Sequence, residues 1–138
     1  MKIKVLLVIP GKEVQTIRIP ASIKFIKSFI GENLFRIKLD ENTVLIANKN
    51  AKFDDFNRIF KGNIILGTFL IISIKNNRKV SMKKKTVRKY TNMFKIKRHQ
   101  KKIDIYKEEF LEEYYYRKRE RKEKNRKHNK EIIFKNVA

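Results

Sequence analysis

The chain has 138 residues, with 36 Lys or Arg against 14 Asp or Glu, so its formal net charge is +22 at pH 7. A charge of this size attracts polyanions and opposes self-association, which favours a monomer. The absence of cysteine excludes a disulfide framework and a cysteine-based zinc site, and every apolar run is shorter than the roughly 18 residues of a membrane span, so no membrane partner is expected.

The first part of the chain predicts strands around one helix. The expected strands are residues 2–9, 14–19, 33–39 and 43–47. Pro10-Gly11 is a strong turn pair after the first of them. Residues 21–30 place apolar side chains at helical spacing, with Ser22 expected in the first turn and Gly31 just past the end. The basic start of the chain is interpreted as a strand and not as a signal peptide.

The most apolar stretch, residues 62–74, is the expected centre of the fold. Nine of its thirteen residues are Ile, Leu, Phe or Thr, and none is charged. Such a run predicts a strand buried on both faces. Gly67 is expected to mark a bulge or bend that lets one long strand serve two parts of a curled sheet. Asn76-Asn77 predicts the turn that follows.

The remaining segments are less regular. Residues 49–61 have no clean period and predict a loop with a short helical turn. Residues 80–94 predict a helix, residues 95–102 a basic linker, and residues 104–130 a long helix. The second half of that helix, Arg117–Lys130, contains no apolar residue, so it cannot pack on a core.

These elements predict an α+β fold: a small curled mixed β-sheet of about five strands, barrel-like, with two short helices and a long basic C-terminal helix. We expect a core domain at residues 1–95 and a basic helical extension at residues 96–138. The charge follows this division, because residues 75–138 carry 24 Lys or Arg against eight Asp or Glu, a net of +16. Between Asp55 and Asp104 there is no acid at all.

The basic run from Arg78 to Lys102 is the strongest functional signal, because cations that neutralise phosphates bind nucleic acid tightly and with little regard to sequence. A merely solvated surface is the alternative. The candidate binding residues are Arg58, Arg78, Lys79, Lys83, Lys84, Lys85, Arg88, Lys89, Lys95, Lys97, Arg98, Lys101, Lys102, Tyr115, Arg117, Lys118, Arg119, Arg121 and Lys122.

Several of the candidates have a structural alternative. Tyr90 and Phe94 could stack on bases, but their place on the apolar side of the helix favours the core. Arg58 offers a planar donor fork to phosphate, yet a role in closing the loop onto the fold is favoured. Three consecutive tyrosines, residues 114–116, cannot all face one side, so at least one should be exposed, either to a partner or over the open edge of the core.

Catalysis has little support in the sequence, so no enzymatic activity and no cofactor are expected. The two histidines, His99 and His128, are expected on the surface of a basic tail. Two acidic pairs, residues 40–41 and 54–55, are interpreted as solvated turn formers and not as a metal site.

A set of residues at fixed spacing points to a family. The set is Pro10-Gly11-Lys12-Glu13, Ile19, Gly31, Asn48, Lys52, Asn57-Arg58, Ile65, Gly67-Thr68-Phe69, Val80-Ser81-Met82, Tyr90 and Phe94. In order and spacing it resembles the uncharacterised domain-of-unknown-function family three-eight-four-six, over about residues 5–95. Glu32 stands where that family usually has a second glycine, and its typically acidic closing helix is basic here. The resemblance implies a small α+β fold and an origin in bacterial phages, plasmids or integrated elements, and thus the cytoplasm of a bacterial host cell.

A weaker likeness covers residues 31–66. Asn33–Ile37, Val44–Ala47, Lys52 and Arg58–Ile65 are similar in order to the oligonucleotide-binding barrel of translation initiation factors one and one-A. It implies a curled, barrel-like sheet.

The sequence therefore predicts a small accessory protein that binds DNA or RNA through its basic C-terminal half. One alternative is an inhibitor, similar to anti-CRISPR proteins, that binds a host nucleic-acid-handling or defence enzyme or its nucleoprotein complex. Another is a ribosome- or RNA-associated protein with an oligonucleotide-binding barrel. Because like charges repel along residues 117–130, we also expect that segment to be helical only when it continues the half that carries the tyrosines. We expect it to fray beyond about Lys124 in the free protein and to become ordered on a polyanion.

Overall fold

The computed structural model describes residues 1–52, 55–111, 116 and 119–120. The chain divides into two compact units, residues 1–104 and residues 105–138. The described elements are β1 (Lys2–Val8), β2 (Gln15–Pro20), α1 (Ile23–Ile30), β3 (Leu34–Asp40), β4 (Thr43–Asn48), β5 (Phe56–Phe60), β6 (Asn63–Leu66), β7 (Phe69–Lys75), β8 (Arg78–Val80), α2 (Lys84–Met93), α3 (Ile96–Tyr106) and a π-helical segment (Lys107–Leu111). The predicted α+β class is confirmed, with eight strands in place of about five.

Six of the strands form one antiparallel sheet in the order β2-β1-β7-β4-β3, and β8 also pairs with β7. β5 and β6 form a separate two-stranded ribbon. Within the described residues the outer strands β2 and β3 do not pair with each other, so the sheet is open and does not close into a barrel. The prediction of a central strand buried on both faces is confirmed for β7, since Phe69–Ser73 are all buried.

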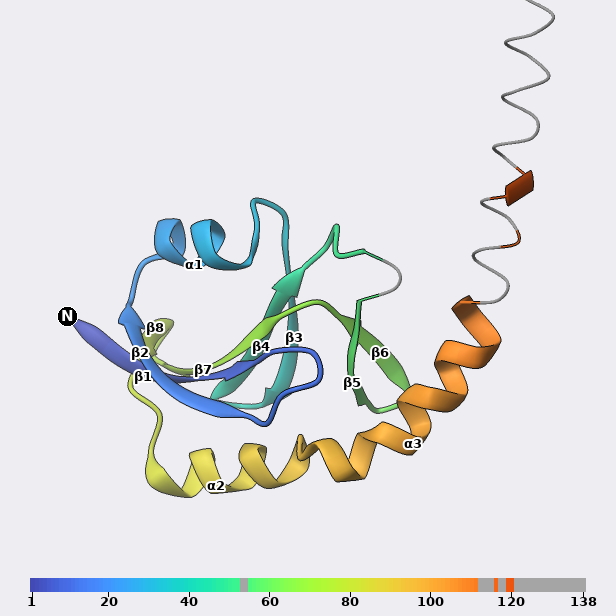
Figure 1. The fold of residues 1–138 in the computed structure, drawn as a ribbon. Coiled ribbons are helices and arrows are strands. Elements are labelled where there is room, and N and C mark those ends of the chain that lie inside the picture. The colour runs from blue at the N-terminus through green and yellow to red at the C-terminus, as the bar shows by residue number, and fades with distance from the viewer. Residues whose placement is uncertain (53–54, 112–115, 117–118, 121–138) are drawn as a thin grey trace, which may run out of the picture. The chain divides into compact units, whose positions relative to one another are not determined.

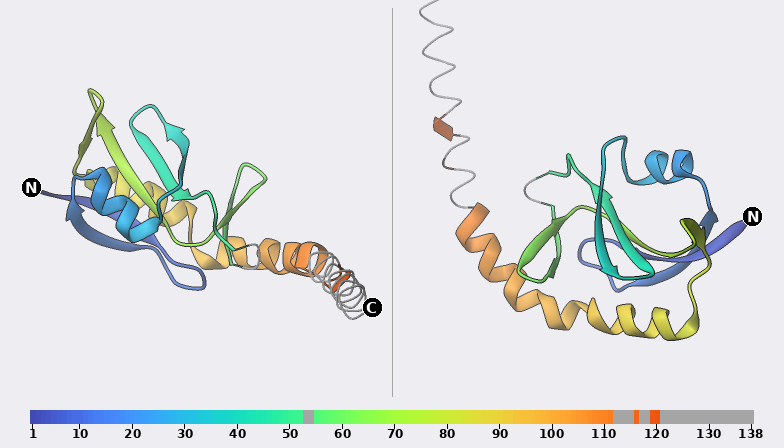
Figure 2. Two further views of the ribbon diagram at one scale, coloured as in Figure 1. Left: turned by 90° about the horizontal axis from the view of Figure 1, so that it is seen from above. Right: turned by 180° about the vertical axis from the view of Figure 1, so that it is seen from behind.

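Two hydrophobic cores lie on opposite faces of this sheet, because successive side chains of a strand point to opposite sides. In β1, Ile3, Val5 and Leu7 belong to the core under α1, where Ile26 and Ile30 are buried. Leu6 and Val8 belong to the other core, with Tyr90 and Phe94 from the α2 side. Figure 1 and the rear view in Figure 2 show α1 and α2 on opposite sides of the sheet.

Gly67 divides the long apolar stretch into β6 and β7. Its φ of +72° lies in a region that side chains other than glycine adopt only with strain, and a Cβ here would lie 3.1 Å from that of Ala51. The predicted bend at this glycine is therefore sharper than expected, and it places the two halves in different sheets. The predicted turn at Asn76-Asn77 is present, with φ values of 50° and 60°.

Three predicted segments differ from the structure. Residues 80–94 are not one helix: Arg78–Val80 form β8, Met82 N–H donates to Lys4 O, and α2 begins only at Lys84. The expected basic linker at 95–102 belongs to helix α3 from Ile96 onward, and Ile96, His99 and Ile103 have the helical spacing that could have shown it. Ser22 is the N-cap of α1, where its hydroxyl accepts from Phe25 N–H, and is not in the first turn.

The expected loop at residues 49–61 contains strand β5, all five of whose residues are buried. Its register with β6 shifts between Phe56 and Arg58. Such a bulge breaks the alternation of inward and outward side chains. Consecutive polar residues, Asn57 and Arg58, are therefore both buried, and that burial hid the strand from a hydrophobic pattern.

The Arg58 side chain, 1% exposed, crosses the core as its largest fully buried group. Nε donates to Phe94 O (2.8 Å), Nη1 to Asn57 Oδ1 (2.8 Å), and Nη2 to Lys12 O (2.5 Å). Asn57 Nδ2 in turn donates to the carbonyls of Val8 and Gly67, at 2.9 and 2.7 Å. These bonds join the β5–β6 ribbon, the β1–β2 turn and the end of α2. The interpretation of Arg58 as a residue that closes this segment onto the fold is confirmed.

His99 is buried at the start of α3, and its expected place on the surface is wrong. Its Nδ1 accepts from Ile59 N–H (3.3 Å), which leaves the proton on Nε2 to donate to Met93 O (2.7 Å). Its ring stacks on Phe94, with centroids 5.7 Å apart. Burial lowers the pKa of His99, and the nearby charges of Arg58, Lys102 and Arg98 lower it further against the opposing bond to Met93.

We expect Arg58→Ala to lower the free energy of unfolding by about 3 kcal/mol or more, because it removes charge-assisted bonds and leaves buried carbonyls without donors. Urea unfolding followed by circular dichroism measures this. The matched control is Arg36→Ala, an exposed arginine of β3, with an expected cost within about 0.5 kcal/mol. Equal costs for the two variants would contradict the structural role of Arg58.

Acid should destabilise the fold through His99. Its folded pKa lies below the ordinary 6.5, so the unfolded chain protonates first as the pH falls. The contribution of the neutral ring is complete above about pH 6.5 and declines below it, by at most about 1.4 kcal/mol per pH unit, until the folded pKa is reached.

Urea unfolding at about pH 7 and about pH 5.5 tests this on either side of the ordinary histidine pKa. We expect His99→Gln to remove most of the pH dependence and His128→Gln, the only other histidine, to retain it. A His99→Gln variant with the unchanged pH dependence would show that another group titrates.

Candidate nucleic-acid interface

Thirteen cations gather on β7, β8, α2 and α3, and together they are called the basic surface. They are Lys75, Arg78, Lys79, Lys83, Lys84, Lys85, Arg88, Lys89, Lys95, Lys97, Arg98, Lys101 and Lys102. All are exposed except Lys79, which is half-buried. Lys75 is the one member that is not among the predicted binding residues, although its charge is counted in the net of +16 for residues 75–138.

The helices expose these cations because their apolar residues are taken by the core. In α2, Tyr90 is buried and Val87 packs against the same core, which leaves Lys84, Arg88 and the residues beside them facing solvent. In α3, His99 and Ile103 are buried, while Lys97, Arg98, Lys101 and Lys102 are exposed. Fixed helices therefore present the charge in a set arrangement.

Few acids offset this charge. Lys89 Nζ lies 3.9 Å from Asp40 Oδ2, and no other cation of the basic surface forms an ion pair with a described residue. Glu13 lies near the junction of α2 and α3, where its Oε1 accepts from Ile96 N–H at 2.9 Å. Unpaired cations repel one another, so the arrangement favours a polyanionic partner.

The aromatic residues interleaved with these charges do not face outward. Tyr90, Phe94 and His99 are 1%, 0% and 8% exposed. The core interpretation of Tyr90 and Phe94 is confirmed, and base stacking by these three rings is excluded in the folded state. Arg58 is likewise a core residue, so the structure contradicts its inclusion among the binding residues.

The second unit contains the remaining candidates. Tyr116, Arg119 and Glu120 are exposed. Tyr115, Arg117, Lys118, Arg121 and Lys122 lie outside the described residues, as do His128 and the segment beyond Lys124 that is expected to fray. The long C-terminal helix is described from Ile96 as α3 and the π-helical segment as far as Leu111.

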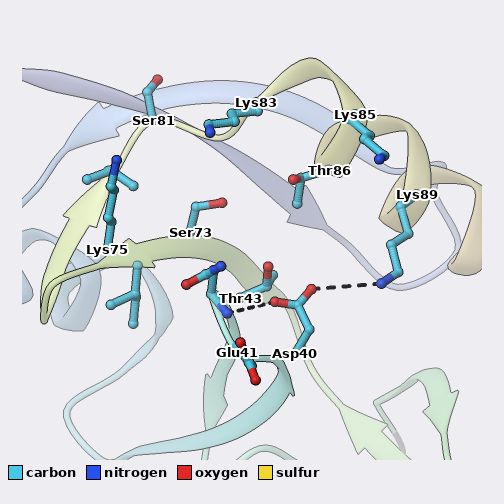
Figure 3. Close-up of a pocket in the computed structure, with 13 residues that line it drawn as sticks. Asp40, Glu41, Thr43, Ser73, Lys75, Ser81, Lys83, Lys85, Thr86 and Lys89 are labelled. Carbon is cyan, nitrogen blue, oxygen red and sulfur yellow. Dashed lines mark hydrogen bonds and ion pairs between the residues drawn. The ribbon is translucent and has the colours of Figure 1, made fainter.

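A pocket of about 530 Å³ opens at the N-terminal end of α2. It lies between that helix end and the strands β4, β7 and β8, and its lining includes Asp40, Ser73, Lys75, Lys83, Lys85 and Thr86 (Figure 3). The sequence pattern did not indicate this pocket, because its residues come from three separate stretches of the chain, 40–43, 73–75 and 80–89.

Asp40 lines this pocket, and its carboxylate bonds to neighbouring protein groups. It accepts from Tyr90 Oη and from Asn42 N–H (2.8 Å), and Lys89 is beside it. Partial burial raises the pKa of Asp40, but the bonds from Tyr90, Asn42 and Thr43 and the charge of Lys89 outweigh burial and hold it below its ordinary value. The carboxylate is therefore ionised and locally compensated.

No group of three or more potential metal ligands is found among the described residues. Within the same residues, no helix is both long and apolar enough to cross a membrane.

Comparison with known proteins identifies the first ninety-five residues. Neither the curated proteins nor the solved structures contain a match to this chain. The likeness to the barrel of the initiation factors is not confirmed, and the open sheet order given above differs from a closed barrel. The model of one family, described as Domain of unknown function (DUF3846), matches residues 1–95. The basic surface is thus carried partly by that matched segment and partly by α3, and the chain belongs to the DUF3846 family.

Proposed function

We propose that this protein binds nucleic acid through the basic surface, largely independently of sequence. The observation that carries the proposal is the set of thirteen cations on two helices and the adjoining strands, with no acid between residues 55 and 104. Lysine and arginine side chains neutralise backbone phosphates and release counterions, which requires no base contacts. The burial of Tyr90, Phe94 and His99 supports phosphate contact over base stacking.

The proposal describes a binding protein and not an enzyme. Of the two histidines, His99 is held by Ile59 and Met93 in the core and is not presented to a substrate. A monomer in the cytoplasm of a bacterial host is part of the same proposal, supported by the net charge of +22 and the absence of cysteine.

A second candidate is binding to a host nucleic-acid-handling or defence enzyme. The observation that favours it is α1, where Ile23 and Phe29 are 39% and 45% exposed and Phe25 stacks on Phe29. Exposed apolar groups on the side opposite α2 suit a protein partner. Pull-down from host lysate with and without nuclease separates the two candidates, because a specific protein retained after nuclease treatment favours the second.

We expect the affinity for duplex DNA, single-stranded DNA or structured RNA to fall linearly with salt on logarithmic axes, with a slope of about one per phosphate contact. Fluorescence anisotropy over about 50–200 mM salt measures it. The variant Lys84→Gln/Arg88→Gln on α2 should weaken binding to all sequences and reduce the slope by about one to two.

The matched control is Lys24→Gln/Lys27→Gln on α1, which removes the same charge from the other side of the sheet. It should bind nearly as tightly as the unchanged protein. Equal losses of affinity in both variants would show that net charge alone causes the binding. No binding near physiological salt would refute the proposal.

A further inference from the structure

The pocket at the N-terminal end of α2 is lined by the hydroxyl-bearing residue Ser73. Ser73 is 8% exposed, and its Oγ makes no hydrogen bond with a described residue. It follows Ile71 on the α2 side of β7 and pairs with Thr43 across the strand. Figure 3 shows the hydroxyls of Ser73 and Thr86 directed toward each other across the hollow. Among the described residues no buried side-chain N or O atom lacks a partner, so the Ser73 hydroxyl must be accessible from the pocket, where it can bond to a ligand.

The groups around Ser73 are mostly donors. Lys75, Lys83 and Lys85 line the pocket with it. The N-cap of α2 is Lys83, which forms no side-chain capping bond, and the first turn contains no acid. The first backbone N–H groups of this helix thus lack acceptors from a cap, and they lie at the pocket that Lys83, Lys85 and Thr86 line.

The acids of the pocket do not form a cation site. Asp40 is occupied by Tyr90, Asn42 and Lys89, as described above. The Thr43 hydroxyl bonds to Asp40, which leaves Ser73 as the free one of the two paired hydroxyls. In Figure 3, Glu41 points away from Lys83 and Thr86. The remaining donors of the pocket therefore suit an anion.

We propose that this pocket binds a phosphate monoester group, with Ser73, Thr86 and Lys83 as its donors. A dianion with three free oxygens can accept from hydroxyls, ammonium groups and helix N–H groups at once, and charge-assisted bonds of this kind are the strong ones. The volume of about 530 Å³ suits a small ligand. This inference goes beyond the proposed function, because a discrete site binds one phosphate group whether or not the basic surface holds a nucleic-acid backbone.

Backbone amide NMR spectra of the full chain, titrated with inorganic phosphate at constant ionic strength, test the site directly. The expected result is a saturable shift at Ser73 and at residues 83–86, with sodium chloride as the reference salt. Shifts no larger than those in chloride, or shifts spread evenly over the basic surface, would overturn the proposal.

Two variants assign the effect to the pocket. Ser73→Ala removes only the hydroxyl, and Lys83→Gln removes an exposed charge; each should weaken phosphate binding by about tenfold or more. If Ser73→Ala does not fold, Lys83→Gln still decides, because its side chain is exposed. The matched controls are Ser28→Ala and Lys27→Gln on α1, which should bind phosphate unchanged. Equal binding by pocket and control variants would refute the site.

The source of the phosphate is resolved by probes that share the monoester. A free nucleotide is supported if adenosine monophosphate competes with inorganic phosphate, adenosine does not, and 5′-phosphorylated and 5′-hydroxyl oligonucleotides bind equally. Tighter binding of a 5′-phosphorylated oligonucleotide than of its 5′-hydroxyl counterpart, lost in Ser73→Ala, supports a strand end. Failure of both probes and of inorganic phosphate overturns the inference, while loss of the salt-dependent binding of unphosphorylated strands refutes only the proposed function.

Discussion

The arrangement of the first unit depends on a guanidinium group removed from water. Arg58 is 1% exposed, and its donors reach the carbonyls of Phe94, Asn57 and Lys12. Burial lowers the pKa of Arg58 and the charge of Glu13 raises it, but an arginine remains protonated in either case. A buried cation requires acceptors on every side. That requirement draws the β5–β6 ribbon, the β1–β2 turn and the C-terminal end of α2 toward one point.

The buried contacts around Arg58 also fix the positions of the charged helices α2 and α3. Phe94 is the C-cap of α2, and its carbonyl bonds to Arg58, where a cation complements the partial negative charge of a helix end. His99, in the first turns of α3, bonds to Ile59 of the ribbon and to Met93 of α2. Both helices are therefore anchored by buried polar contacts from inside, while their lysines and arginines remain in solvent. The same buried contacts therefore hold in place the helices that carry the exposed charge.

The two faces of the sheet have different chemical characters. The α1 side has a core of buried aliphatic residues and exposes Ile23 and Phe29. The α2 side has the basic surface and, at the N-terminal end of α2, a pocket that Ser73, Thr86 and Lys83 line. The pocket exists because Val80 pairs with Ser73 and the chain then needs Ser81 and Met82, both bonded to Lys4, before the helix begins. A helix beginning at residue 80, as the sequence pattern indicated, would have no such connection.

Local sequence patterns were sufficient to predict much of this protein's secondary structure. Apolar alternation and turn residues predicted β1–β4, the central strand β7, α1 and the buried side of α2, and charge counting predicted the basic surface, because each signal lies within one short segment. Tertiary structure decided what those signals could not contain. Strand β5 carries buried polar residues at a bulge, so it has no apolar period. The buried positions of Arg58 and His99 depend on partners 36 and 40 residues away, and the pocket joins residues from three separate stretches of the chain. Charge is a property of composition, whereas burial is a property of neighbours that only the folded chain brings together.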